Sequence, residues 1–205
     1  MHLNDGMIFT GELEMPMMNP FNGDLPECIL PFNKAMTATH HDYCVHFFLD
    51  DYQFERVWRQ PEKYLSVLKR FRSVLSPDFS LFADMPLPLQ IYNTYRNRLI
   101  GRWLQLHGLA VIPTVSWSGP QSYRFCFDGV PNGGAVAIST IGTRKNDYAR
   151  HLWEEGVTAM IERLQPTMVL VYGQPVSYDF GSAEVRYYSN EITEKLHNYG
   201  RERSF

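Results

Sequence analysis

The chain has 205 residues, of which 44% are hydrophobic and 14% aromatic, and its formal net charge is -3 at pH 7. This composition supports one packed domain and excludes a largely disordered chain. The small negative charge gives no global electrostatic reason to expect nucleic-acid binding. No apolar run approaches the roughly 18 residues of a membrane span, and no signal-peptide pattern opens the chain. The three widely spaced cysteines favour free thiols. We therefore expect a soluble cytoplasmic protein without a membrane partner.

The first 42 residues predict an irregular arm. They are rich in Met, Pro, Asn and Gly and carry no sustained periodicity. Their prolines prevent long helices, and the pair Asn22-Gly23 signals a turn. Apolar residues such as Ile29 should pack the arm on the domain, with one short strand or hairpin. We predict an N-terminal arm over 1–42 and a single α/β domain over 43–205.

From residue 43 onward, short apolar runs alternate with helical patterns. The predicted strands are 43–51, 78–84, 109–117, 134–140, 167–173 and 184–189. The predicted helices are 51–58, 61–71, 88–107, 147–164 and 190–204. This alternation indicates βαβ units and a mostly parallel sheet of five or six strands. Because these units are too few for a complete eight-stranded barrel, we expect an open doubly wound sheet or an incomplete barrel-like one.

The carboxyl ends of these strands predict the location of a site. In parallel α/β sheets, ligands bind outside these ends. The predicted ligand-binding residues are Ser116, Trp117, Ser118, Ser139, Thr140, Gly142, Thr143 and Tyr172. Hydroxyls would bind the ligand, and Trp117 or Tyr172 would stack a flat group. The alternative is that such residues only cap and turn the chain.

Acidic residues at the same ends predict the catalytic groups. Asp50 and Asp84 are the candidates for general acid–base catalysis. Together with Asp51 they would offer oxygen ligands to Mg²⁺. Against a metal role, Asp50 with Gln53 resembles a capping box for the helix that follows. We therefore assign no metal site and leave Mg²⁺ as an open cofactor.

The segment ISTIGTRKN, residues 138–146, is the most phosphate-like loop. Its hydroxyls and the backbone around Gly142 precede a helix, and Arg144 and Lys145 lie nearby. A helix N-terminus favours an anion, although the segment has neither the P-loop nor the Rossmann glycine spacing. A capped loop with solvated cations is the alternative.

Histidines and arginines of the sequence raise two further possibilities, a zinc site and a nucleic-acid-binding face. The histidines of THHDYC have no second ligand pair at zinc-finger spacing, so zinc is not expected. Arg96, Arg98 and Arg102 could form a phosphate-contacting helix face for nucleic acid, for which the alternative is an ordinary solvated face.

Four segments also carry a family resemblance: VLSPDFSLF, MPLPLQIYNTYRNRLIGRWLQLHGLAVIPTVSW, CFDGVPNGGAVAISTIGT and VLVYG. In this order they resemble an uncharacterised family carried by bacteriophages, prophages and integrative elements. The likeness covers about residues 43–175. Because that family has no established activity, the resemblance implies a mobile-element protein of the bacterial cytoplasm and assigns no catalytic residue.

Three functional hypotheses follow. The first is a protein that binds, or as an enzyme processes, a phosphate-bearing small molecule or nucleotide at the carboxyl ends of the strands. The second is a nucleic-acid-binding accessory factor, and the third a non-catalytic protein that binds a host protein through its arm or another surface. The first is preferred because hydroxyl, acidic and aromatic groups are all expected at one rim.

Overall fold

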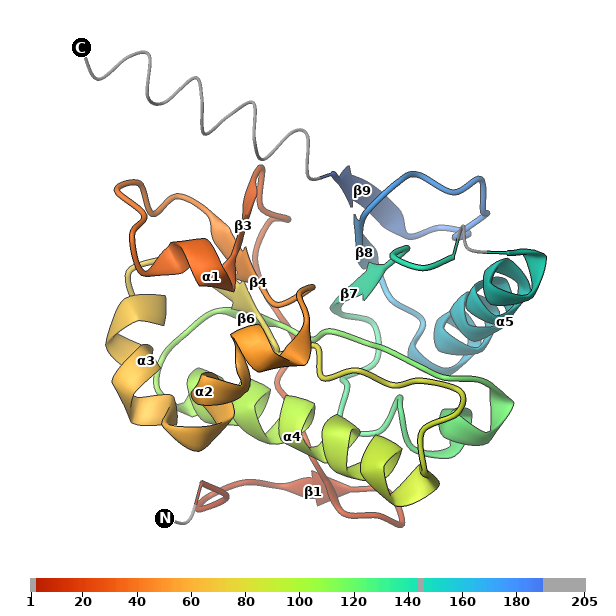
Figure 1. The fold of residues 1–205 in the computed structure, drawn as a ribbon, viewed down its shortest axis with the longest axis horizontal. Helices are drawn as coiled ribbons and strands as arrows, with labels where there is room; N and C mark the ends of the chain where they lie inside the picture. Colours follow the sequence, from red (N-terminus) through yellow and green to blue (C-terminus); the bar gives the residue numbers. More distant parts are fainter. Residues whose placement is uncertain (1–2, 144–145, 190–205) are drawn as a thin grey trace.

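The computed structural model describes residues 3–143 and 146–189 and shows an α/β fold (Figure 1). The strands are β1 (Phe9–Thr10), β2 (Met15–Pro16), β3 (Ile29–Pro31), β4 (Cys44–His46), β5 (Ser73–Leu75), β6 (Val111–Ile112), β7 (Ala135–Ser139), β8 (Met168–Tyr172) and β9 (Glu184–Tyr188). The helices are α1 (Phe32–Ala35), α2 (Glu55–Arg59), α3 (Pro61–Leu68), α4 (Leu87–Leu106) and α5 (Asp147–Leu164), with 3-10 turns at Asp51–Gln53 and Pro120–Arg124. The predicted α/β class is confirmed.

The strands form two parallel sheets and one antiparallel hairpin. The sheets have the orders β3-β4-β5-β6 and β7-β8-β9, and β1 pairs with β2. A bridge between Thr114 and Ala137 joins the two parallel sheets. There the N–H of Val115 donates to the Ala137 carbonyl, and the N–H of Ala137 donates to the Pro113 carbonyl, both at 2.8 Å. The strands from β3 to β9 therefore follow one another in chain order.

The inner faces of both sheets share one hydrophobic core. Ile29 of β3, Leu75 of β5 and Leu170 of β8 belong to the same buried cluster. The helices lie on the outer faces, where Leu68 of α3 and Met160 of α5 belong to two separate clusters. In Figure 1, α1, α2 and α3 lie on one side of the strands and α5 on the other. The helices therefore pack on the sheet faces that point away from the shared core.

The two long helices agree with their predictions because their sequence signals are local. The Asn146 side chain caps α5 by accepting a hydrogen bond from the Ala149 N–H at 2.8 Å. The helix ends where Gln165 adopts the left-handed conformation at φ 48°. α4 starts after Pro86 and ends just before Gly108, which has a φ of +85°. These caps fix the helix ends independently of distant residues.

Part of the predicted N-terminal arm over 1–42 belongs to the first parallel sheet. The arm does contain the β1–β2 hairpin, but Ile29–Pro31 pairs in parallel with Cys44–His46 and so belongs to the first sheet. Pro31 does not prevent this, because β3 is an edge strand and needs no donor on its outer side. Prolines thus obscured a strand that belongs to the α/β domain.

Two further expectations are corrected. The segment 78–84 is a loop, and the strand before it is β5, which ends just before Ser76 and Pro77. Pro77 has no N–H with which to extend the ladder. The parallel strands form two sheets where one sheet of five or six strands was expected. The predicted helix 190–204 lies outside the described residues, and among those described no helix is apolar and long enough to cross a membrane.

Candidate functional site

The carboxyl ends of the parallel strands meet at one rim, which we call the carboxyl rim. Ser139 at the end of β7 is in register with Tyr172 at the end of β8, and Tyr172 with Tyr188 of β9. The bridge from Thr114 to Ala137 brings Ser116, two residues later, level with Ser139. The structure therefore brings Ser116, Ser139 and Tyr172 together, as the sequence predicts.

The most distinctive feature of the carboxyl rim is a hydrogen bond between the segments that follow two adjacent strands. The Ser116 hydroxyl, after β6, donates a short hydrogen bond to the Asp78 carboxylate, after β5. Both side chains are half-buried. We call Asp78 and Ser116 the acid–hydroxyl pair. Sequence reasoning missed Asp78 because it was placed inside a strand, although Pro77 was a signal that the strand had ended.

The surroundings of Asp78 raise the pKa of its carboxyl group. Burial raises its pKa to about 7. The hydrogen bond from Ser116 and the charge of Arg98 act to lower the pKa, whereas the Asp51 carboxylate acts to raise it. A carboxyl group that titrates near neutrality can both accept and return a proton, as a general acid–base catalyst must.

A second carboxylate approaches from the neighbouring strand. Asp51, at the start of the 3-10 turn that follows β4, accepts hydrogen bonds from the Ser80 hydroxyl at 2.7 Å and from the Ser80 N–H at 3.2 Å. These bonds tie the loop after β4 to the loop after β5. Within the described ranges, no three His, Cys, Asp or Glu side chains gather closely enough to hold a metal ion.

Aromatic rings fill the interior directly inside the carboxyl rim. Tyr172 stacks on Phe48 with ring centroids 5.0 Å apart, and its ring lies 4.5 Å from that of His46. The His46 Nδ1 accepts a hydrogen bond from the Phe48 N–H at 3.3 Å. Burial lowers the pKa of His46 to about 3. Tyr172 thus lies at the rim as predicted, packed against its neighbours.

His46 makes a testable contribution to acid sensitivity. An unfolded histidine, with a pKa near 6.5, binds a proton that the native state rejects down to about pH 3. The contribution of the neutral His46 to the free energy of unfolding should therefore be complete above pH 6.5. It should be lost as the pH falls from 6.5 toward 3, by up to about 1.4 kcal/mol per pH unit. The raised pKa of Asp78 has the opposite effect, since it favours the native state as the pH falls below 7.

Denaturant unfolding of the wild type and His46→Gln at pH 7 and pH 5 separates the two effects. The stability difference between the proteins should shrink at pH 5, because only the wild type carries the histidine penalty. The imidazole NMR signals of His46 should stay those of a neutral ring at pH 5. A protonated His46 at that pH contradicts the assignment.

Trp117 and Ser118 lie beside the carboxyl rim but take part in packing. The Trp117 Nε1 donates to the Leu152 carbonyl at 3.2 Å, and its ring packs against Gly156 of α5. Ser118 is buried and donates to Gln90 Oε1 at 2.5 Å. The predicted stacking surface of Trp117 is therefore occupied by α5.

The hydroxyls of the loop 139–143 are bonded within the protein. Thr140 donates to the Gln174 carbonyl at 2.8 Å, and Thr143 donates to the Thr140 carbonyl at 2.8 Å. Ser139 donates to the Tyr172 carbonyl at 3.3 Å. Gly142 has a φ of +88°, which favours glycine. These bonds shape the loop, and Arg144 and Lys145 lie outside the described residues.

An open concavity lies between this loop and the first turn of α5. Its volume is about 440 Å³. It is lined by Thr143, Asn146, Asp147, Arg150, Pro175, Val176 and Ser177. Arg150 supplies a cation there, although its guanidinium Nε already lies 2.8 Å from Glu154.

The two predicted catalytic acids do not join the acid–hydroxyl pair. Asp84 is exposed in a turn before α4 and follows no strand. Asp50 is also exposed, and its side chain makes no capping hydrogen bond. Asp84 does not follow a strand end, because the strand predicted over 78–84 is a loop. Next to Asp50, the side chain of Asp51 accepts hydrogen bonds from Ser80.

The predicted arginine face is mostly buried. Arg98 is 1% exposed and donates to the carbonyls of Thr114, Cys126 and Asp128. Arg96 is 8% exposed, and its guanidinium lies 2.8 Å from Glu55 and 3.8 Å from the Phe79 ring centroid. Arg102 is half-buried. Arginines 96 and 98 are therefore structural, which argues against this helix as a nucleic-acid-binding face.

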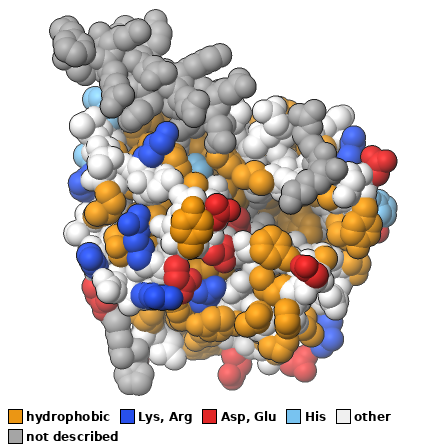
Figure 2. All heavy atoms as spheres, viewed as in Figure 1, with side chains coloured by type: hydrophobic (Ala, Val, Ile, Leu, Met, Phe, Trp, Pro, Cys, Tyr) orange, Lys and Arg blue, Asp and Glu red, His pale blue; other side chains and the backbone are white. Residues whose placement is uncertain are grey.

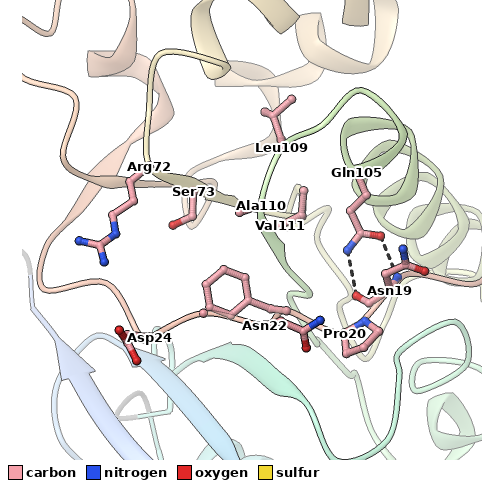
Figure 3. A pocket seen from close by; sticks show the side chains of 12 residues that line it. Asn19, Pro20, Asn22, Asp24, Arg72, Ser73, Gln105, Leu109, Ala110 and Val111 are labelled. Atoms are coloured by element: carbon pink, nitrogen blue, oxygen red, sulfur yellow. Dashed lines mark hydrogen bonds between the residues drawn. The ribbon is translucent and has the colours of Figure 1, made fainter.

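A second concavity opens at the amino ends of β5 and β6, opposite the carboxyl rim. Its volume is about 390 Å³, and arm residues 19–24 form one wall. Figure 3 shows two hydrogen bonds that join the Gln105 side chain to the Asn19 backbone, at 2.8 and 2.9 Å. Ser73 and Val111, the first residues of their strands, line the opposite wall. Sequence reasoning, which looked only at carboxyl ends, did not anticipate this feature.

Hydrophobic side chains also reach the surface near the site. Figure 2 shows them over the start of α4, where Phe82, Leu87, Leu89 and Tyr92 are exposed. Phe82 belongs to the same loop as Asp78. The surface beside the carboxyl rim is thus partly apolar.

Comparison with known proteins agrees with the resemblance seen in the sequence. Residues 8–189 match the family described as a domain of unknown function, DUF4417. The chain is 44% identical over 180 residues to the "Gene 1 protein" of Mycobacterium phage L5, covering 84% of this chain and 77% of that protein. It is 40% identical over 157 residues to the "Gene 1 protein" of Mycobacterium phage D29, covering 73% of this chain and 58% of that protein. No solved structure matches. The chain therefore belongs to the DUF4417 family, and it is similar to these two mycobacteriophage proteins.

Proposed function

We propose that this protein binds a phosphate-bearing small molecule or nucleotide at the carboxyl rim and processes it by acid–base chemistry at the acid–hydroxyl pair. The observation that carries the proposal is the short hydrogen bond from Ser116 to a half-buried Asp78 at adjacent strand ends. Active sites of parallel α/β barrels lie at this end of their strands. Asp78 thus takes the role that the sequence suggested for Asp50 and Asp84.

The chemistry assigned to the pair is a proton transfer. The Asp78 carboxylate accepts a proton from the Ser116 hydroxyl, or from a substrate hydroxyl or water that takes its place. The oxygen that loses the proton attacks the phosphorus of the ligand, so an O–P bond forms while the bond from phosphorus to the leaving oxygen breaks, and protonated Asp78 gives its proton to that leaving oxygen. Where Ser116 is the nucleophile, water then cleaves the phosphoserine and restores the hydroxyl. The pKa of about 7 suits both steps at neutral pH.

The phosphate group is assigned to the half of the rim formed by β7 and α5. The concavity at the first turn of α5 supports this placement, because the backbone N–H groups of a helix start attract anions. Ser116 is level with Ser139, which leads directly into this loop. A ligand bound across these neighbouring strand ends would place its phosphate near α5 and its reacting atom near Asp78.

Turnover by three variants tests the proposal. A panel of nucleoside mono-, di- and triphosphates and sugar phosphates is incubated with protein, and ³¹P NMR follows product formation. Asp78→Asn and Ser116→Ala should lose at least about 100-fold in rate, the usual contribution of a general acid–base group. Asp84→Asn, which removes an exposed carboxylate from the loop after β5, should retain the wild-type rate.

Either of two results would contradict the proposal. One is that the wild type turns over no member of the panel. The other is that the folded Asp78→Asn protein matches the wild-type rate on a substrate that the wild type does process.

A non-catalytic role in binding a host protein is the second candidate. It is favoured by the exposed Phe82, Leu87, Leu89 and Tyr92 beside the site. The same variants discriminate the two functions. Partner binding through these apolar residues should be insensitive to Ser116→Ala, which changes only a half-buried hydroxyl.

A further inference from the structure

A layer of buried polar groups lies beneath the acid–hydroxyl pair. We call it the buried polar layer, and its members are Ser76, Asn97, Arg98 and Thr114. Their exposed fractions are 0%, 5%, 1% and 1%. Ser76 lies two residues before Asp78, and Thr114 lies two residues before Ser116, so the layer is joined to both members of the pair by the backbone.

The layer replaces a backbone ladder that the sequence interrupts. The last ladder bond between the two segments runs from the Ser76 N–H to the Ile112 carbonyl, at 3.0 Å. Pro77 and Pro113 have no N–H to continue it. The Thr114 N–H donates to the Ser76 Oγ, and the Thr114 hydroxyl donates to the Ser76 carbonyl, both at 2.8 Å. Side chains therefore fix the spacing of the two segments beyond the end of the sheet.

Helix α4 completes the layer from the outside. Asn97 Oδ1 accepts hydrogen bonds from the Ser76 hydroxyl at 2.9 Å and from Arg98 Nη1 at 2.6 Å. Arg98 Nη1 also donates to the Thr114 carbonyl at 2.9 Å. Asn97 Nδ2 donates to the same carbonyl at 3.3 Å. A network whose members satisfy one another is rigid, because each broken bond leaves a buried polar atom without a partner.

We propose that the buried polar layer positions the acid–hydroxyl pair, with Thr114 and Ser76 setting the approach of Ser116 to Asp78 and α4 holding them in place. The inference rests on the proposed function for its catalytic meaning and on these contacts for its geometry. The members of the layer are positioning residues, because their hydrogen bonds join them to one another and the backbone links Ser76 to Asp78 and Thr114 to Ser116. The charge of Arg98 supports the same role, since it opposes the rise in the pKa of Asp78.

A matched pair of variants at one position tests the proposal. Thr114→Val removes the hydroxyl and keeps the branched shape, whereas Thr114→Ser keeps the hydroxyl. Carboxyl ¹³C NMR measures the pKa of Asp78 in both. Thr114→Val should raise that pKa by about one unit, because a displaced Ser116 no longer stabilises the carboxylate. Thr114→Ser should restore the wild-type value. Ser76→Ala is the second variant, and it should shift the pKa in the same direction.

A purely structural role predicts a different outcome. If Thr114→Val and Ser76→Ala lower the melting temperature but leave the pKa of Asp78 at its wild-type value, the positioning role is overturned. If Thr114→Val does not fold, Ser76→Ala decides by the same measurement. The titration needs no substrate. A shifted pKa in a protein that turns over no phosphate compound would therefore uphold the positioning role while the proposed function fails.

Discussion

Gly156→Ala is expected to be among the most destabilising single-methyl changes in this protein. A Cβ at this position in α5 would lie 2.0 Å from Trp117 Nε1 and 2.2 Å from Trp117 Cε2. The indole cannot easily retreat, because its Nε1 is bonded to the Leu152 carbonyl of the same helix. The helix must move away from the second sheet. We expect a loss of about 3 kcal/mol in the free energy of unfolding, the upper part of the range for overpacked cores.

Denaturant unfolding measures this loss, and a double variant identifies its cause. Trp117→Ala by itself should lower the free energy of unfolding. In the Trp117→Ala protein, however, Gly156→Ala should lower it much less than in the wild type, because the clash with the indole is gone. Gly134→Ala is the control, because its Cβ would meet neighbours only at 3.6 Å or beyond. Equal losses at positions 156 and 134 would refute the close packing of Trp117 under α5.

Arg98→Met is expected to cost even more. The guanidinium donates to the carbonyls of Thr114, Cys126 and Asp128 and to Asn97 Oδ1. Methionine fills most of the volume but donates nothing. Each buried carbonyl left without a partner costs about 1–3 kcal/mol, so the total should reach about 4 kcal/mol or more.

The melting temperature and the soluble yield of Arg98→Met test this expectation. Arg59→Met is the matched control, because the Arg59 side chain is 73% exposed and pairs only loosely with Glu55, at 3.6 Å. The control should stay within about 0.5 kcal/mol of the wild type. Comparable stability in both variants would show that Arg98 does not hold these loops together.

The parts of the fold that could be predicted are those with local signals. α4 and α5 span several turns and carry proline, asparagine or glycine at their ends, so periodicity and capping were sufficient. β5, over which no strand was predicted, has three residues, too few for any periodic pattern. Short strands of this kind exist because neighbouring strands supply their hydrogen bonds, and a single chain segment does not encode those neighbours.

The candidate site was predicted in location but not in membership. Ser116 was found because it follows a clear apolar run, and the rule of carboxyl ends then placed it correctly. Asp78 was missed because the loop that holds it looks as apolar as a strand. Arg98 was assigned to a solvated face, since nothing local reveals that three carbonyls from distant segments would surround it. The packing of Trp117 against α5 was not foreseen, because its partner, Gly156, lies 39 positions away in the chain.

The most direct test of the central claim is to locate the ligand on the protein. Amide and methyl NMR signals would be followed while nucleotides and sugar phosphates are added to the full chain. We predict that the largest shifts occur at Asp78, Ser116 and Ser139 on the carboxyl rim, while Ser73 and Val111 in the amino-end concavity remain unchanged. Shifts confined to Ser73 and Val111, or none with any compound, would contradict a phosphate-binding site at the carboxyl rim.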